Sequence, residues 1–240
     1  METEFQTKDE NMGKIAALLP AYNEEKHLGG ILDELKKYIS EIVVVDDGSK
    51  DRTKQIAEEK GVTVLSRGYN MGVGQTIKDG LAWAMEQGFD AVVMLDADGQ
   101  HLPSEIDRLI QDYQTNHHHL VIGYRDYRRI PLRRRIPNII GKFLLSWAVG
   151  TNLPDNQSGY RLVDKEFIPI ILNSNEKGFN FMVEMITFCI AQGWKIGWVP
   201  ISTIYSDEKS HQKAWYQITG FTRMCLQARN TIRRAKQKSR

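Results

Sequence analysis

The sequence has little cysteine, almost no net charge and no long apolar run. Only two cysteines occur among the 240 residues, Cys189 and Cys225, so a disulfide scaffold is excluded and a reducing compartment is favoured. The net charge of +2 is too small for a dedicated nucleic-acid-binding protein, and we expect no nucleic-acid partner. The content of 41% hydrophobic and 26% charged residues suits a folded domain with a sizeable core.

Targeting and membrane-spanning segments are missing as well. The best membrane candidate, from Phe143 to Pro154, has twelve residues without a charge, whereas a spanning helix needs about 20 apolar residues. The N-terminus, METEFQTKDENMGK, is polar and acidic, unlike a signal peptide. We therefore expect a cytoplasmic protein that begins with a mobile tail over residues 1–13.

Two common phosphate-binding motifs are absent. No G-x-x-x-x-G-K-[ST] sequence occurs, which excludes a P-loop. Gly72 and Gly74 resemble part of a dinucleotide fingerprint, but Ile77 stands where the third glycine belongs. A hydride-transferring Rossmann enzyme is therefore disfavoured.

Short β-branched runs alternate with helical periodicity along the first half of the chain. Strands are predicted at residues 15–19, 42–45, 62–65, 91–95, 120–122 and 194–200, with helices between them and at about 138–149 and 179–192. This rhythm predicts an α/β fold with a central, mostly parallel sheet flanked by helices. No repeat or long linker occurs, so residues 14–221 are expected to form a single domain, followed by a basic helix or tail over residues 222–240.

Polar turns follow three of the predicted strands, at residues 21–24, 46–49 and 96–101. Ligands in such sheets bind beyond the carboxyl ends of the strands, so the three turns are expected to converge on one site.

Asp96 and Asp98 are the main chemical signal, because they follow a buried strand and are two residues apart. In extended backbone both carboxylates point the same way and favour a cation between them, with Gln100 as a third oxygen ligand. Hard oxygen ligands suit Mg²⁺ or Mn²⁺. A solvated turn is the plainer alternative.

Asp46 and Asp47 form a second acidic pair at another strand end, where an acid can accept hydrogen bonds from a ribose or base. Ordinary turn and helix-cap chemistry is the alternative. His117, His118 and His119 are adjacent, so their imidazoles diverge, and a polar helix end is favoured over a metal site.

Basic residues gather in two places. Six arginines occur between Arg125 and Arg135, and nine Lys or Arg residues without any acid occur from Lys209 to Arg240. A solvated face is the plainer interpretation of the second run, and a phosphate-binding role is favoured for the first.

Taken together, the ordered motifs resemble the family 2 glycosyltransferases of the GT-A (nucleotide-diphospho-sugar transferase) fold, over about residues 15–221. The motifs are Pro20-Ala21-Tyr22-Asn23-Glu24, Val45-Asp46-Asp47-Gly48-Ser49, Asn70-Met71-Gly72-Val73-Gly74, Asp96-Ala97-Asp98-Gly99-Gln100-His101, Gly123-Tyr124-Arg125 and Ser158-Gly159-Tyr160-Arg161. The 96–101 motif looks most like the branch of dolichyl-phosphate mannosyltransferases and polyprenyl-phosphate relatives.

The resemblance implies a nucleotide-sugar donor, such as GDP-mannose or a UDP-hexose, and an inverting, metal-dependent transfer. It implies a nucleotide-sugar site formed by Pro20, Tyr22, Glu24, Asp46, Asp47, Gly74 and Asp96. It places Mg²⁺ or Mn²⁺ on Asp96, Asp98 and Gln100. It assigns the acceptor or transferred phosphate to Arg125, Arg133, Arg135, Arg161 and Lys209, the last standing near where relatives carry an arginine.

A polyprenyl-phosphate acceptor needs no essential base, because a phosphate monoester is largely ionised near neutral pH. An alcohol acceptor would need one, and Glu184 and Asp155 are the candidates. The expected catalytic residues are Asp96, Asp98 and Arg125, as the resemblance implies, together with Glu184. Glu184 is equally consistent with a structural acid. A family 2 enzyme that acts on a non-lipid acceptor in cell-wall or polysaccharide synthesis is the alternative.

The apolar helix after Arg133 carries Ile140, Phe143 and Trp147, which suits either an interfacial helix or a core-facing one. The first option predicts peripheral contact at the inner face of the plasma membrane. A non-catalytic membrane-surface adaptor and a homo-oligomeric or membrane-protein partner stay open.

Overall fold

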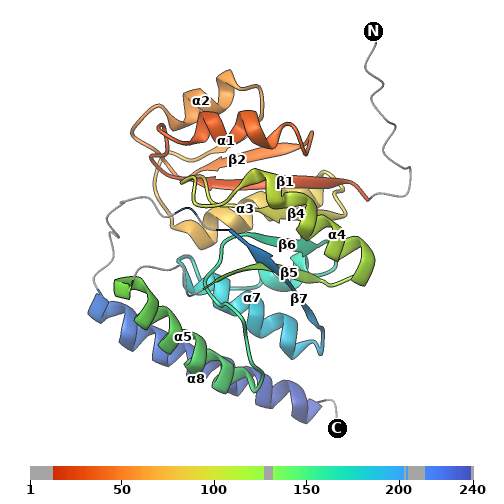
Figure 1. Cartoon of the computed structure of the whole chain (residues 1–240), viewed down its shortest axis with the longest axis vertical. Helices are drawn as coiled ribbons and strands as arrows, with labels where there is room; N and C mark the ends of the chain where they lie inside the picture. Colours follow the sequence, from red (N-terminus) through yellow and green to blue (C-terminus); the bar gives the residue numbers. More distant parts are fainter. Residues whose placement is uncertain (1–12, 127–131, 203, 205–213, 239–240) are drawn as a thin grey trace.

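In the part of the chain that the structure describes, seven strands form one mixed sheet (Figure 1). They are β1 (Ile15–Ala21), β2 (Ile42–Asp46), β3 (Thr63–Ser66), β4 (Ala91–Met94), β5 (Leu120–Arg125), β6 (Arg161–Asp164) and β7 (Ile196–Ile201), in the order β3-β2-β1-β4-β6-β5-β7. The computed structural model describes residues 13–126, 132–202, 204 and 214–238, and of residues 132–134, 214–219 and 238 it describes the backbone alone.

Helices cover both faces of this sheet. They are α1 (Leu28–Leu35), α2 (Thr53–Glu59), α3 (Val73–Glu86), α4 (Ile106–Asn116), α5 (Leu132–Val149), α6 (Ile168–Leu172), α7 (Asn180–Ala191) and α8 (Ala214–Lys238), with a 3₁₀ turn, η1 (Pro103–Glu105), before α4. Apolar residues of α1, α2 and α4 share one core, and those of α3, α5, α6, α7 and α8 share the other.

The central strands are apolar throughout because both faces are covered. In β1, Leu18 belongs to one core and its neighbour Leu19 to the other, as expected when successive side chains point to opposite faces. The strands β1, β2, β3 and β4 pair in parallel, so their carboxyl ends meet at one edge. The predicted α/β class, with a mostly parallel sheet flanked by helices, is confirmed.

Strand β6 was not predicted. It is inserted antiparallel between β4 and β5, with Leu162 opposite both Val93 and Val121. Its four residues are Arg-Leu-Val-Asp, so the apolar run between the two charged residues is too short to predict a strand. The surrounding sheet stabilises this short strand, since local propensity alone does not predict it.

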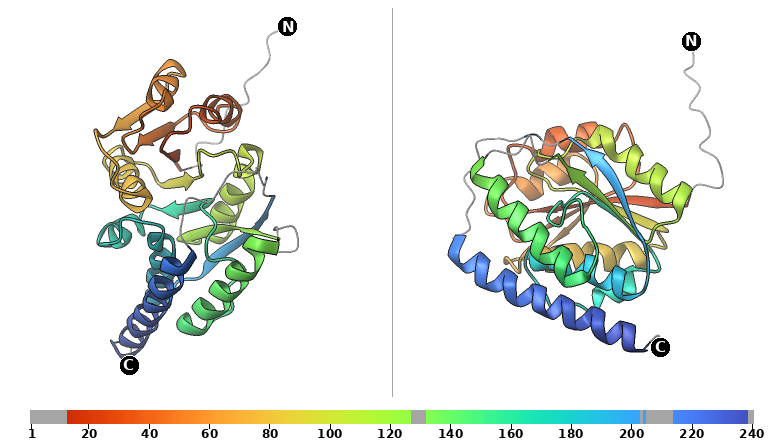
Figure 2. Two further views of the ribbon diagram at one scale, coloured as in Figure 1. Left: turned by 90° about the vertical axis from the view of Figure 1, so that its left-hand side faces the viewer. Right: turned by 60° about the horizontal axis from the view of Figure 1, so that its bottom comes forward.

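Helices α5 and α8 lie side by side at the end of the molecule opposite α1 and α2 (Figures 1 and 2). Helix α5 begins at Leu132, before the predicted start near Asn138, and it includes Pro137. The expected domain boundary after residue 221 falls inside α8, which buries Met224, Cys225 and Ile232 against the core. Among the described helices, none has the length and apolarity needed to cross a bilayer.

Candidate functional site

The three polar turns lie together because β1, β2 and β4 are parallel neighbours. The Asp47 amide donates to the carbonyl of Ala21 (2.9 Å), and the Leu95 amide donates to the carbonyl of Leu18 (3.1 Å). These bonds extend the sheet just beyond its assigned ends and align the turns at one edge.

The first two turns are held together by side-chain to backbone hydrogen bonds. The Asn23 amide donates to Ser49 Oγ (2.9 Å), and the Lys50 amide donates to Asn23 Oδ1 (2.8 Å). Asn23 has a φ of 59°, a left-handed conformation that asparagine tolerates better than most residues. The predicted Pro20, Tyr22 and Glu24 flank this junction, and Tyr22 is 44% exposed. These hydrogen bonds hold the two turns together and leave the Tyr22 ring accessible to solvent.

Asp46 is buried at the end of β2. Its carboxylate accepts from the Ser49 amide (3.1 Å) and from Ser66 Oγ (2.9 Å). It also lines an open pocket of about 410 Å³, together with the 48–52 turn, α2 and the 66–68 segment; the lining includes Arg52 and Arg67. Most residues that line this pocket are polar or charged.

Asp47 holds the glycine-rich segment in place. Its two carboxylate oxygens accept from the amides of Met71 (2.8 Å) and Gly72 (2.9 Å). Gly72 has a φ of 94°, and a side chain there would approach the Lys177 carbonyl to 2.5 Å. The predicted Gly74 also donates its amide to that carbonyl (2.8 Å). Asp47 therefore positions the loop through backbone contacts.

Asp96 and Asp98 form the turn after β4. The Gln100 amide donates to Asp98 Oδ1 (2.9 Å), which closes the turn. A Cβ at Gly159 would lie 2.5 Å from Asp96 Oδ2, so the Asp96 carboxylate packs directly over that glycine. Burial raises the pKa of Asp96, against the opposing charges of Arg125 and Arg161. Two carboxylates in one turn, of which Asp96 is desolvated, fit a hard divalent cation.

His101 contacts the backbone of this turn from within the core. Its ring is buried, and its Nδ1 accepts from the Asp96 amide at 3.3 Å, which requires the neutral tautomer protonated on Nε2. Burial lowers the pKa of His101 to about 4, so the ring is neutral at physiological pH. His101 also packs against the Tyr160 ring, with centroids 5.2 Å apart. We assign it a positioning role behind Asp96.

Arg125 forms a bidentate ion pair with Asp155. Arg125 Nε lies 2.7 Å from Asp155 Oδ2, and Nη2 lies 3.0 Å from Oδ1. Burial alone would raise the pKa of Asp155, but the charge and hydrogen bonds of Arg125 outweigh it and hold that pKa below its usual value. Arg125 ends β5 and Asp155 follows α5, so the pair joins the two ends of the α5 excursion.

Arg161 lies deeper than the sequence suggested. It is fully buried, and it donates from Nε to the Ser158 carbonyl (2.8 Å) and from Nη1 to the Met182 carbonyl (2.6 Å). Burial lowers its pKa to about 10, while Asp155 and Asp96 oppose that shift. Its described bonds tie the 158–161 segment to α7, so Arg161 supports the site from within the core.

Asn156 is a residue that sequence reasoning missed. It is fully buried, and neither its Oδ1 nor its Nδ2 has a hydrogen-bond partner among the described residues. Its Nδ2 faces Gly141 of α5, where a Cβ would lie 3.8 Å away. Its place beside Asp155 was the only available signal.

Glu184 lies in a separate polar cluster between α3 and α7. Ser174 Oγ donates to Glu184 Oε2, and Lys78 Nζ donates to the Ser174 carbonyl at 2.8 Å. Burial raises the pKa of Glu184, which the hydrogen bond from Ser174 opposes. These contacts support the structural interpretation of Glu184, whereas Asp155 is the carboxylate beside Arg125.

The remaining predicted phosphate ligands are only partly described. Arg135 is half-buried on α5, the side chain of Arg133 is outside the described part of the chain, and Lys209 lies outside the described residues. On α5 itself, Ile136, Ile140, Phe143, Leu144 and Trp147 form a stripe that is 37–65% exposed, which we call the α5 apolar stripe. The opposite side of α5 buries Leu145, Ala148 and Val149.

The fold matches that of solved sugar-nucleotide enzymes. The glucosyl-3-phosphoglycerate synthase of Mycobacterium tuberculosis, crystallised with Mn²⁺, UDP and glucosyl-3-phosphoglycerate, superposes with a TM-score of 0.70 at 18% identity. The match covers 90% of this chain and 78% of that one. Crystals of the same enzyme with Mg²⁺ and UDP give a TM-score of 0.68. The sheet and its polar edge therefore define a GT-A glycosyltransferase fold.

Sequence comparisons narrow this class. The chain belongs to glycosyl transferase family 2, whose family model matches residues 16–170, and it is a glycosyltransferase. It is 30% identical over 217 residues to the UDP-N-acetylglucosamine–dolichyl-phosphate N-acetylglucosaminyltransferase of Methanococcus voltae, covering 80% of this chain and 86% of the relative. It is 33% identical over 208 residues to the undecaprenyl-phosphate mannosyltransferase of Micrococcus luteus, covering 80% and 84%.

Proposed function

We propose that this glycosyltransferase moves a sugar from a nucleotide-sugar donor to a polyprenyl phosphate at a membrane surface. The observation that carries the proposal is the pairing of two unlike regions: a rigid polar edge with Asp96, Asp98 and Arg125, and the exposed α5 apolar stripe. The named functions of the two relatives support the same acceptor class.

The donor is proposed to bind at the polar edge. Asp46 and the neighbouring pocket receive the nucleoside, while Asp47 keeps the glycine-rich loop in register. Asp96, Asp98 and Gln100 would hold Mg²⁺ or Mn²⁺, whose charge stabilises the leaving nucleoside diphosphate. His101 and Gly159 fix the Asp96 carboxylate in the turn.

The acceptor phosphate is proposed to approach Arg125. Asp155 aligns the guanidinium through two bonds, and the positive charge and planar fork of an arginine suit phosphate recognition. The second pKa of a phosphate monoester is about 6, so the attacking phosphate oxygen is largely ionised at neutral pH. The acceptor therefore needs no general base beside Arg125. Inversion follows from one direct displacement at the sugar carbon.

The α5 apolar stripe gives the lipid acceptor a place to enter. Side chains such as Phe143 (65% exposed) and Trp147 (54% exposed) have no apolar cover in the described structure. Arg229 of α8 lies over the Trp147 ring at 4.1 Å, which places a cation beside the stripe. An apolar helix with adjoining basic residues suits the boundary of an anionic bilayer.

A transfer assay with labelled donors tests the proposal. Purified enzyme would receive GDP-mannose, UDP-glucose or UDP-N-acetylglucosamine, with undecaprenyl or dolichyl phosphate, in the presence and absence of Mn²⁺. We expect metal-dependent label in the lipid phase, and none with Asp98→Ala. Label only in water-soluble products would indicate a non-lipid acceptor and overturn the lipid assignment. Failure to bind any of these donors would overturn the proposed donor class.

A further inference from the structure

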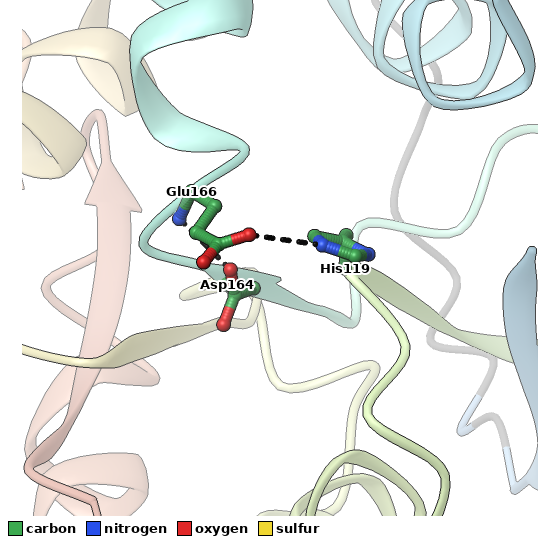
Figure 3. A group of neighbouring side chains, drawn as sticks. All are labelled: His119, Asp164 and Glu166. Atoms are coloured by element: carbon green, nitrogen blue, oxygen red, sulfur yellow. Dashed lines mark hydrogen bonds and ion pairs between the residues drawn. The ribbon is translucent and has the colours of Figure 1, made fainter. Parts of the chain in front are cut away.

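A second cluster of ligating side chains lies at the opposite edge of the sheet. His119 precedes β5, while Asp164 ends β6 and Glu166 follows it (Figure 3). Arg125 stands at the far end of β5, six residues along the strand direction and therefore about 20 Å away. This cluster is separate from the donor and acceptor sites described above.

The three neighbouring histidines do not act together. His117 caps α4 in a left-handed conformation (φ 53°), and His118 Nδ1 lies 2.7 Å from Asp112 Oδ1. His119 alone turns toward the two carboxylates, with its Nε2 at 3.3 Å from Glu166 Oε2. The expectation of a polar helix end therefore holds for two of the three residues.

The spacing of the ligand atoms suits one small cation. One ligand atom from each of His119, Asp164 and Glu166 can be chosen so that all lie within 4.8 Å of one another. Tetrahedral Zn²⁺ has N and O ligands at about 2.0–2.2 Å, which puts neighbouring ligand atoms about 3.4 Å apart. The His119–Glu166 separation already has this value, and the exposed Glu166 side chain can close the rest.

Neighbouring groups hold two of the ligands in position. The His119 ring stacks on Trp194, with centroids 3.8 Å apart and planes 7° from parallel. Asp164 Oδ2 accepts from the Tyr113 hydroxyl (2.7 Å) and Oδ1 accepts from the Glu166 amide (2.8 Å). Each carboxylate oxygen keeps a further lone pair, and outer partners of this kind orient metal ligands.

We propose that His119, Asp164 and Glu166 form a second cation site, selective for a borderline ion such as Zn²⁺ over Mg²⁺. The imidazole nitrogen provides that preference, since Mg²⁺ favours all-oxygen sites such as the Asp96–Asp98 turn. An ion there would link the start of β5 to the turn after β6, and so stabilise the folded chain.

Zinc titration calorimetry on the full chain tests the site. The titration uses the Asp98→Asn background, which is expected to weaken binding at the other turn. We expect one saturable Zn²⁺ site that Mg²⁺ does not compete for, weakened by roughly tenfold or more in Glu166→Gln. The matched control is Glu86→Gln, an exposed glutamate on α3, which should leave Zn²⁺ affinity unchanged.

A second variant separates ligation from folding. His119→Phe keeps an aromatic ring for the Trp194 stack and removes the nitrogen, so it should abolish Zn²⁺ binding and the Zn²⁺-induced rise in melting temperature. Equal Zn²⁺ affinity in Glu166→Gln and Glu86→Gln would overturn the proposal. So would the absence of a saturable site, or retained binding in folded His119→Phe.

Discussion

The turns after β1 and β2 hydrogen-bond to each other, whereas the α5 apolar stripe leaves its large side chains exposed. In the turns, Asp46 and Asp47 are buried and their oxygens accept backbone or hydroxyl protons. On α5, Phe143 is 65% exposed. The first region is preorganised for a polar ligand, and the second gains free energy only when a partner covers it.

The largest effect is expected from removing the Arg125–Asp155 ion pair, which lies between the polar edge and α5. Asp155→Asn removes a fully buried carboxylate that faces the largely buried Arg125 charge, so we expect a loss of about 3–5 kcal/mol in unfolding free energy. Urea denaturation measures this, with Glu86→Gln as the exposed control. Wild-type stability in Asp155→Asn would mean that the pair does not join the two regions.

The same variant carries a pH signature. Because the folded-state pKa of Asp155 lies below its usual value, its contribution to stability is present above the ordinary carboxyl range and is lost as the pH falls through the folded pKa. Asp155→Asn should therefore lose less stability on acidification than the wild type does.

Asp98→Asn should remove chemistry without removing the fold. Asp98 is only partly buried, and its described bond closes a local turn. Loss of one carboxylate ligand is expected to lower kcat at least a hundredfold, about 3 kcal/mol, at saturating Mn²⁺. Melting temperature should change little. An unchanged kcat in Asp98→Asn would contradict the assignment of this turn as the metal site.

Phe143→Ser tests whether the α5 apolar stripe binds a membrane. Burying a phenylalanine contributes about 1.5–3 kcal/mol, so the variant should bind phosphatidylglycerol-containing vesicles about thirtyfold more weakly. Leu145→Ala is the matched control, since Leu145 lies on the buried side of the same helix. That control should lose stability and keep vesicle affinity. Equal vesicle binding by Phe143→Ser and wild type would contradict membrane contact through the stripe.

Asp47→Asn tests the rigidity of the donor side. The asparagine amide places N–H groups against the amide of Met71 or Gly72, which costs about 1–2 kcal/mol. We expect donor KM to rise about tenfold while kcat falls much less. A fall in kcat with unchanged KM would indicate that Asp47 acts on the reaction rather than on the loop.

Sequence alone predicted the parts of the fold that depend on local pattern. The apolar strands follow from short β-branched runs, as in β2, and the polar turns from their place after such runs, as after β4. Strand β6 could not be predicted in this way, because Leu162 and Val163 gain their strand conformation from pairing with β4 and β5.

The site was predictable in its residue types and less so in their roles. Asp47 and Arg161 stand in motifs, but their hydrogen bonds join them to segments far away in the chain, the glycine loop and α7. Such partners depend on tertiary packing. The same holds for Glu184, whose partner Ser174 lies on the connection before α7.

The smallest expected effect concerns α8. Arg233 is exposed on this helix, and each basic residue near an anionic surface contributes about 1 kcal/mol. Arg233→Gln should therefore weaken binding to anionic vesicles about fivefold, and raised salt should erase the difference because the interaction is screened. Neutral phosphatidylcholine vesicles should not distinguish the variant from wild type. A loss that persists at high salt would mean that Arg233 acts through packing, and the contrast between the polar edge and the helix pair would then rest on the α5 apolar stripe alone.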